Sequence, residues 1–234
     1  MEPWQLYSFL VIQILTGILS IILAFLIYKR NSEYKGNIYL SLAFSLYSLY
    51  PIGRFFYELG FNELVVHISL RVSLLGSILG MGAFLIAISI FCLGSYAKEL
   101  KKYKIVGGIV TTLVCLVIIY PGSITFEQLD PTTTIWSKIL MGVFSAYILL
   151  TTTRMVYLLT NTINEIKDKN PEISENLKTF RLALLFSLGI VLFSIIENIT
   201  QIHFLNIFTY LFLLLFMIFF SYPLMKKKNS PKIE

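Results

Sequence analysis

The chain has 234 residues, of which 56% are hydrophobic and 14% charged, and its mean hydropathy is +0.77. These values exclude an ordinary soluble domain and predict a membrane protein with several spans and no separate soluble domain. The formal net charge of +6 requires no nucleic-acid partner, because a basic rim that faces anionic lipid accounts for it.

Seven apolar segments follow one another, and each is long enough to cross the roughly 30 Å hydrocarbon core of a bilayer as an α-helix. We expect one seven-helix transmembrane domain over residues 1–228 and a short cytoplasmic tail over 229–234. The predicted fold class is therefore an all-α polytopic bundle, with helices at residues 6–28, 37–59, 68–95, 105–121, 136–160, 180–200 and 203–225.

The segments differ in character along the chain. The first is too long for a signal-peptide core and has no basic lead, so we expect it to remain as an uncleaved helix. In the second, Pro51 is expected to introduce a kink. The links at 122–135 and 161–180 are polar and contain the turn signals Asp130-Pro131 and Asn170-Pro171, so both are expected to be exposed loops, the second with room for a short surface helix.

The third segment carries small residues at spacings of three and four, which places them on one stripe of a helix. Such stripes let neighbouring backbones approach closely in membranes. We therefore expect this helix to be the central packing element, with close contacts at Ser73, Gly76, Gly80 and Ala83.

The distribution of basic residues predicts the orientation of the bundle. Arg54, Arg71 and Lys138 fall on one side, and the remaining Lys and Arg residues fall on the other side, which should be cytoplasmic. The N-terminus is then outside the cell and the C-terminus inside. The cytoplasmic set comprises Lys29, Arg30, Lys35, Lys98, Lys101, Lys102, Lys104, Arg154, Lys167, Lys169, Lys178, Arg181, Lys226, Lys227, Lys228 and Lys232.

Ionisable residues near the outer ends of the spans suggest a ligand site, because such residues are costly in a membrane and often functional. We expect them to converge on a pocket for a small polar or anionic ligand, with the two arginines as carboxylate or phosphate clamps. The residues are Arg54, Glu58, Arg71, Glu197, Tyr47 and Tyr50. The alternative is structural: Arg54 pairs locally with Glu58, Arg71 extends to the interface, and Glu197 faces water.

Other kinds of site are not indicated. His67 and His203 start helices, and Cys92 and Cys115 lie inside apolar spans, so we expect no metal site, no cofactor and no catalytic residues. The last segment has no lysine for a Schiff base, which excludes a retinal pigment. No phosphate-binding loop or nucleophile motif is present, so an enzyme is not expected.

Two pairs of segments resemble the N-terminal seven-transmembrane sensor region of prokaryotic histidine kinases. These are LSLAFSLYSLYPIGRFFYELG with ISLRVSLLGSILGMGAFLIAISIF, and LALLFSLGIVLFSIIENI with HFLNIFTYLFLLLFMIFFSYPLMK. In that family a dimerisation helix and an ATP-binding domain follow the last span, whereas the present sequence ends a few residues after Lys228. The resemblance therefore implies a stand-alone sensor without kinase activity.

The function expected from the sequence is a stand-alone, receptor-like sensor of the plasma membrane. It would receive a ligand from outside and pass a signal to a separate partner on its basic cytoplasmic face. The alternatives are a small transporter or channel subunit, and a structural accessory subunit of a membrane complex. A transporter would need polar groups near the middle of the membrane, whereas this sequence concentrates them at the outer end.

Overall fold

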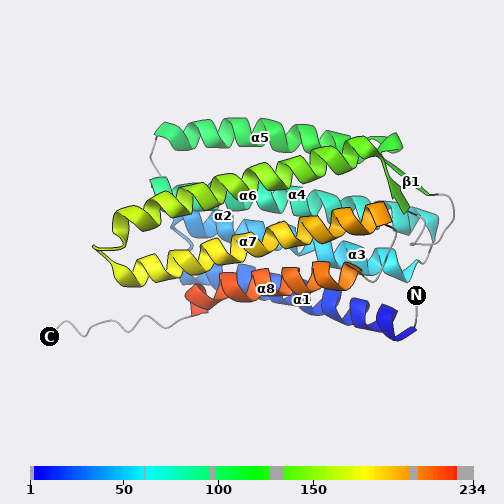
Figure 1. Ribbon diagram of the computed structural model, residues 1–234, viewed down its shortest axis with the longest axis horizontal. Coiled ribbons are helices and arrows are strands. Elements are labelled where there is room, and N and C mark those ends of the chain that lie inside the picture. Colours follow the sequence, from blue (N-terminus) through cyan, green and yellow to red (C-terminus); the bar gives the residue numbers. More distant parts are fainter. Residues whose placement is uncertain (1–2, 61, 95–97, 127–133, 201–204, 226–234) are drawn as a thin grey trace.

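The computed structural model describes residues 3–60, 62–94, 98–126, 134–200 and 205–225, and the helices run side by side along its long axis (Figure 1). The elements in chain order are α1 (Pro3–Arg30), α2 (Lys35–Tyr47), α3 (Leu49–Leu59), α4 (Glu63–Leu93), α5 (Lys98–Ile119), η1 (Pro121–Ser123), β1 (Ile124–Phe126), β2 (Thr134–Trp136), α6 (Lys138–Ile166), α7 (Pro171–Thr200) and α8 (Asn206–Met225).

The bundle has two distinct ends. We call one the hairpin end, because β1 and β2 lie there together with the start of α1 and the link from α3 to α4 (Figure 1, right). We call the other the basic end: α1 finishes there with Lys29 and Arg30, and α2 and α5 begin there with Lys35 and Lys98. The helix α8 runs towards the basic end.

The prediction of a multi-pass helical membrane protein is confirmed. Within the described residues, α1, α4, α5, α6 and α7 are long and apolar enough to cross a membrane, and α8 contributes a shorter apolar stretch at Ile207–Pro223. The helix surfaces are also apolar where they are exposed; Leu113 and Leu116 of α5, for example, are 57% and 59% exposed. Such surfaces are compatible with lipid rather than water.

The second predicted helix is divided in two. The helix α2 ends at Tyr47 and α3 begins at Leu49, with Ser48 between them and its hydroxyl donating to the Ser45 carbonyl at 2.7 Å. Pro51 has no N–H to donate to the Tyr47 carbonyl, which explains why regular helix is interrupted here. Ser48 itself keeps right-handed helical angles, and the Ser48 and Ile52 N–H groups still bond four residues back, so the predicted kink takes the form of one missing helical hydrogen bond at Pro51.

Two helices begin earlier than predicted because polar residues cap or extend them. The helix α4 begins at Glu63 rather than at residue 68, since the Asn62 side chain accepts a hydrogen bond from the Val65 N–H at 2.9 Å. The helix α5 begins at Lys98 rather than at 105. The basic run that was expected as a link is helical as far as Lys104.

The link predicted at 161–180 is mostly helix, which corrects the expected loop. The helix α6 continues to Ile166 and α7 starts at Pro171, so four residues separate them. Proline is favoured in the first helical position, and the Asn170 side chain accepts from the Ile173 N–H at 3.1 Å. Charged segments of this kind can extend a transmembrane helix into water, so the absence of an apolar pattern did not indicate a loop.

A short β-hairpin replaces part of the predicted link at 122–135. The strands β1 and β2 pair antiparallel, with Ile124 opposite Trp136. Ile124 is buried, and the Trp136 ring packs edge-on against Phe144 at 5.8 Å. Residues 127–133, including Asp130-Pro131, lie outside the described residues, as does His203.

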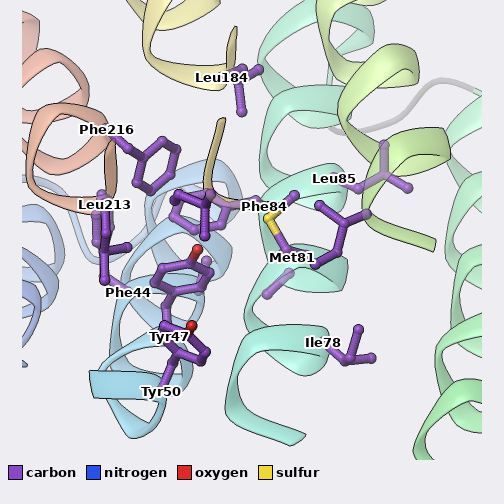
Figure 2. Close-up of a cluster of buried hydrophobic side chains, with 14 of the residues drawn as sticks. Phe44, Tyr47, Tyr50, Ile78, Met81, Phe84, Leu85, Leu184, Leu213 and Phe216 are labelled. Atoms are coloured by element: carbon purple, nitrogen blue, oxygen red, sulfur yellow. The ribbon is translucent and has the colours of Figure 1, made fainter. Parts of the chain in front are cut away.

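The helix α4 lies at the centre of the bundle, where it packs against α2, α3, α5 and α6. Its Phe84 packs against aromatic rings from two other helices (Figure 2). The Phe84 ring is 5.0 Å from Phe44, 5.6 Å from Phe216 and 5.2 Å from Phe220. These contacts join α2, α4 and α8 in one core.

Small residues bring α4 close to the divided span. A Cβ atom added to Gly76 would lie 2.5 Å from the Leu49 Cβ, and one added to Gly80 would lie 3.1 Å from the Tyr47 N. A Cβ atom added to Gly53 of α3 would lie 2.9 Å from the Ser73 Cβ. Ser73, Gly76, Gly80 and Ala83 are all buried.

Candidate functional site

Arg54 is a buried charged residue that lies on α3 near the hairpin end. It is 8% exposed, and α3 carries Tyr50 one turn before it and Glu58 one turn after it. The helical spacing i,i+4 directs these three side chains to one face. A guanidinium group inside a membrane bundle needs polar neighbours, because it stays charged at any physiological pH.

The contacts of the Arg54 guanidinium are long. Its Nη2 lies 3.8 Å from the Glu58 Oε1, and its Nε donates to the Tyr210 hydroxyl at 3.4 Å. The guanidinium also lies over the Tyr57 ring, 5.0 Å from the ring centre. Charge-assisted hydrogen bonds are normally about 2.7–2.9 Å long. The cation is therefore surrounded by suitable groups without being held by a short bond to any of these three.

Tyr210 of α8 connects Arg54 to a third helix. Its hydroxyl accepts a 2.6 Å hydrogen bond from the Gln13 Nε2 of α1, and both side chains are fully enclosed. The Tyr210 ring also packs at 6.1 Å from Phe9. The chain Arg54–Tyr210–Gln13, which we call the polar network, thus joins α3, α8 and α1 near the hairpin end.

The polar network has an unused acceptor. The Gln13 Oε1 is buried and has no hydrogen-bond partner among the residues described. Arg54 and Gln13 both donate to the Tyr210 oxygen, which fills its two lone pairs and leaves its proton for another acceptor. If the Gln13 amide turns over, Oε1 accepts this proton instead, and the amide N–H groups become free to bind a new acceptor. In either orientation, one donor or acceptor of the polar network remains available to a water molecule or ligand.

The helix α7 approaches the network through Tyr50. The Tyr50 hydroxyl is within hydrogen-bonding range of the Ser194 side chain and within electrostatic range of Glu197. Tyr50 and Ser194 also line a cavity of about 20 Å³ that extends past Ser187 and Trp136. This volume suffices for about one water molecule.

The structure brings some predicted site residues together and separates others. Arg54, Glu58 and Tyr50 lie together, and Glu197 lies nearby on α7. Arg71 instead bonds to its own helix, through its Nη1 and the His67 Nδ1 at 3.1 Å. The expected pair of arginine clamps is therefore not formed in this conformation.

Tyr47 has a different environment from Tyr50. Its ring lies in the aromatic core, 6.0 Å from Phe84 and 5.8 Å from Phe216 (Figure 2). Within the described residues, no three His, Cys, Asp or Glu side chains gather closely enough to hold a metal ion. The site is thus an interhelical polar cluster with aromatic walls.

Sequence reasoning missed Gln13 and Tyr210, which complete the network. Gln13 is an isolated amide in an otherwise apolar stretch, and amides in such stretches commonly bond across helices. That signal was available, but its partner lies 197 residues away in the chain. Tyr210 has no comparable signal, because tyrosine also occurs singly on lipid-facing surfaces.

Comparison with protein-family models, with curated proteins and with solved structures finds no match for this chain.

Proposed function

We propose that this protein is a seven-span sensor of the plasma membrane, in which the polar network couples an external signal to the basic end. In this proposal α2 and α3 together form one span and α8 another, which with the five long helices makes seven. The N-terminus is outside, because the basic end carries the excess of Lys and Arg. A separate partner reads the cytoplasmic face.

The observation that carries this proposal is how charge is distributed in the polar network. The carboxylate opposite Arg54 is Glu58 of the same helix, whereas the link to α8 is the neutral Tyr210 hydroxyl. If α8 moves away, the ion pair stays within α3 and Arg54 loses only a neutral acceptor, the Tyr210 hydroxyl. Such a contact is easier to open than an ion pair between helices, whose separation would leave a buried charge unpaired.

A ligand would act by exchanging the partners of Arg54. A carboxylate or phosphate group arriving from outside offers the guanidinium shorter, two-pronged hydrogen bonds than those to Glu58 and Tyr210. Tyr210 is then released from Arg54. Because α8 is a continuous helix of 20 residues, about 30 Å long, a shift at Tyr210 is transmitted to Met225 at the basic end.

The transporter and channel alternative is less well supported, because the polar network lies near the hairpin end rather than at the middle of the bundle. The cavity beside Tyr50, about 20 Å³, holds about one water molecule, so an anion that binds Arg54 must first displace the side chains around it. The remaining alternative, a structural accessory subunit, predicts that the polar network only holds the helices together. The following experiment separates this alternative from the sensor.

The test measures whether breaking the network moves α8 at the opposite end. Spin labels are placed at Phe25→Cys on α1 and Tyr222→Cys on α8, both exposed, in a background with Cys92→Ala and Cys115→Ala. Pulsed electron spin resonance in nanodiscs then gives the distance between the labels. We expect Arg54→Gln to shift or broaden this distance by about 2 Å or more, the scale of helix shifts in switching proteins.

Arg154→Gln is the matched control, because Arg154 of α6 lies over the Tyr103 ring of α5 and the Tyr157 ring of its own helix, and not in the polar network. It should leave the label distance unchanged. If Arg54→Gln remains folded by size-exclusion chromatography and gives the parent distance, the network does not couple the two ends, and the accessory role is favoured.

A further inference from the structure

A large cavity opens at the basic end, remote from the polar network. Its volume is about 450 Å³, within the range of ligand-binding cavities, and it lies between α1, α2, α4 and α7. Its walls are mostly apolar: Leu23 and Ile27 of α1 and Phe180 of α7 are buried, and Phe91 of α4 is half-buried. An empty space of this size would forfeit the dispersion contacts of all these side chains.

One wall residue shows that the cavity faces the lipid. Leu26 lines it and is 47% exposed on the outer surface of α1. The neighbouring exposed residues of α1 include Ile22 and Phe25, so the surrounding surface is one that hydrocarbon covers. The natural occupant of an apolar cavity that opens onto this surface is an acyl chain.

The cavity is polar at one end only. Arg30 and Asn37 line it there, at the end of α1 and in the first turns of α2. Arg30 is exposed, and Lys29 and Lys35 lie close to it in the chain. Positive charge at the level of the lipid headgroups attracts anionic lipids. Leu23 lies two turns deeper than Arg30, about 10 Å along the helix, which leaves room for part of an acyl chain.

We infer that this cavity binds one anionic phospholipid from the leaflet at the basic end. One acyl chain enters past Leu26 and packs against Ile27, Phe91 and Phe180, while the phosphate group lies at Arg30 and Asn37. This inference is independent of the proposed function, because it uses neither the polar network nor the identity of the partner.

The test is native mass spectrometry of the full chain in detergent, titrated with phosphatidylglycerol or with phosphatidylcholine of the same acyl chains. We expect one phosphatidylglycerol molecule to bind with higher affinity than phosphatidylcholine. Arg30→Gln should weaken phosphatidylglycerol binding about fivefold, the effect of one basic residue near a membrane surface. Leu26→Trp should reduce binding of both lipids by filling the entrance, whereas Leu26→Ala should retain it.

Lys101→Gln on α5 is the control for general electrostatic attraction, because Lys101 is exposed at the same end but does not line the cavity. Equal loss of binding in Lys101→Gln and Arg30→Gln would overturn the inference, as would unchanged binding in Leu26→Trp. The same spectra report two other occupants. If Leu26→Trp abolishes a dimer, or if lipid binds only after residues 229–234 are removed, a second copy or the chain's own tail fills the cavity instead.

Discussion

Tyr210 links two helices that do not otherwise share a polar contact in the network. Its hydroxyl accepts from the Gln13 amide of α1 on one side and from the Arg54 guanidinium of α3 on the other. The ring around it is enclosed by apolar groups such as Phe9. The hydroxyl therefore contributes to stability mainly by giving the neighbouring donors a partner, since a buried donor without a partner destabilises the fold by more than a hydrogen bond stabilises it.

Removing this hydroxyl should destabilise the bundle in a way that a second substitution partly reverses. Tyr210→Phe leaves the Gln13 amide without its partner, and we expect a loss of about 1–3 kcal/mol. The melting temperature in detergent, followed by differential scanning fluorimetry, should fall accordingly. In Tyr210→Phe with Gln13→Leu, the hydroxyl and the amide that bonds to it are both replaced by apolar groups, so the part of the loss due to Gln13 should be recovered, whereas Arg54 still lacks the Tyr210 acceptor.

Tyr222→Phe is the control, because Tyr222 lies on the same helix but is 58% exposed. Its melting temperature should stay close to that of the wild type. A result in which Tyr210→Phe melts like Tyr222→Phe would mean that the hydrogen bond to Gln13 contributes nothing measurable.

At the scale of single residues, local spacing predicted the part of the candidate site that lies on α3. Arg54, Glu58 and Tyr50 lie one turn apart, so helical periodicity alone places them together. Arg71 was grouped with them by depth, but depth does not specify which face of a helix a residue occupies. Its interaction with His67, one turn away, is again the kind that spacing can predict. Gln13 and Tyr210 depend on the packing of α1 against α8, which no local pattern encodes.

The element with the strictest packing is α4, whose small residues fit against the divided span. Replacing Gly80 by leucine would place a side chain where the Tyr47 N and the Ala43 carbonyl already lie within about 3.2 Å of the Cβ position. Because backbone atoms cannot move aside, α2 and α4 would have to separate. We expect Gly80→Leu to lower the melting temperature in detergent strongly, or to abolish the monodisperse protein.

Leu85→Ile serves as the matched control on the same helix. Leu85 is buried, but the substitution conserves volume, and such changes usually destabilise by less than about 1.5 kcal/mol. Equal melting temperatures for Gly80→Leu and Leu85→Ile would show that the close approach of α2 and α4 is not required for stability.

Helix existence was more predictable than helix ends. Apolar length indicates where a chain is inside the membrane, but the ends depend on capping and charge outside it. Asn62 begins α4 and Asn170 with Pro171 begins α7, and both signals are local. Because few apolar residues surround these capping residues, the apolar pattern alone placed the start of both helices too late in the chain. The β-hairpin was not predicted because its strands are three residues each and pair across the segment 127–133.

For the whole molecule, the distribution of basic residues predicts the orientation in the membrane. Reporter fusions after Arg30, within 98–104, within 165–178 and after Met225 should all report the cytoplasmic side. Fusions after Gly60 and after Gly122 should report the opposite side. Alkaline phosphatase and fluorescent protein fusions give opposite signals and so check each other.

An even number of spans would place the two ends of the chain on the same side, and the fusions would show it directly. The most informative fusion is the one after Gly60, because α2 and α3 are each too short to meet the length expected of a span. If this fusion is cytoplasmic, the pair forms a re-entrant segment, and the remaining topology must be reassigned.

The missing helical hydrogen bond at Pro51 also weakens the connection between α2 and α3, so the two need not unfold together. The helix α3 has 11 residues, fewer than the 12–15 below which isolated helices are marginal, so its order depends on α4 and α1. Without a Pro51 N–H, the last carbonyl of α2 does not tie it to α3 in the usual helical pattern. Local opening of α3 can therefore leave α2 and the aromatic core intact. The segment that carries Arg54 would then have a lower opening free energy, and faster amide exchange, than the helices on which it rests.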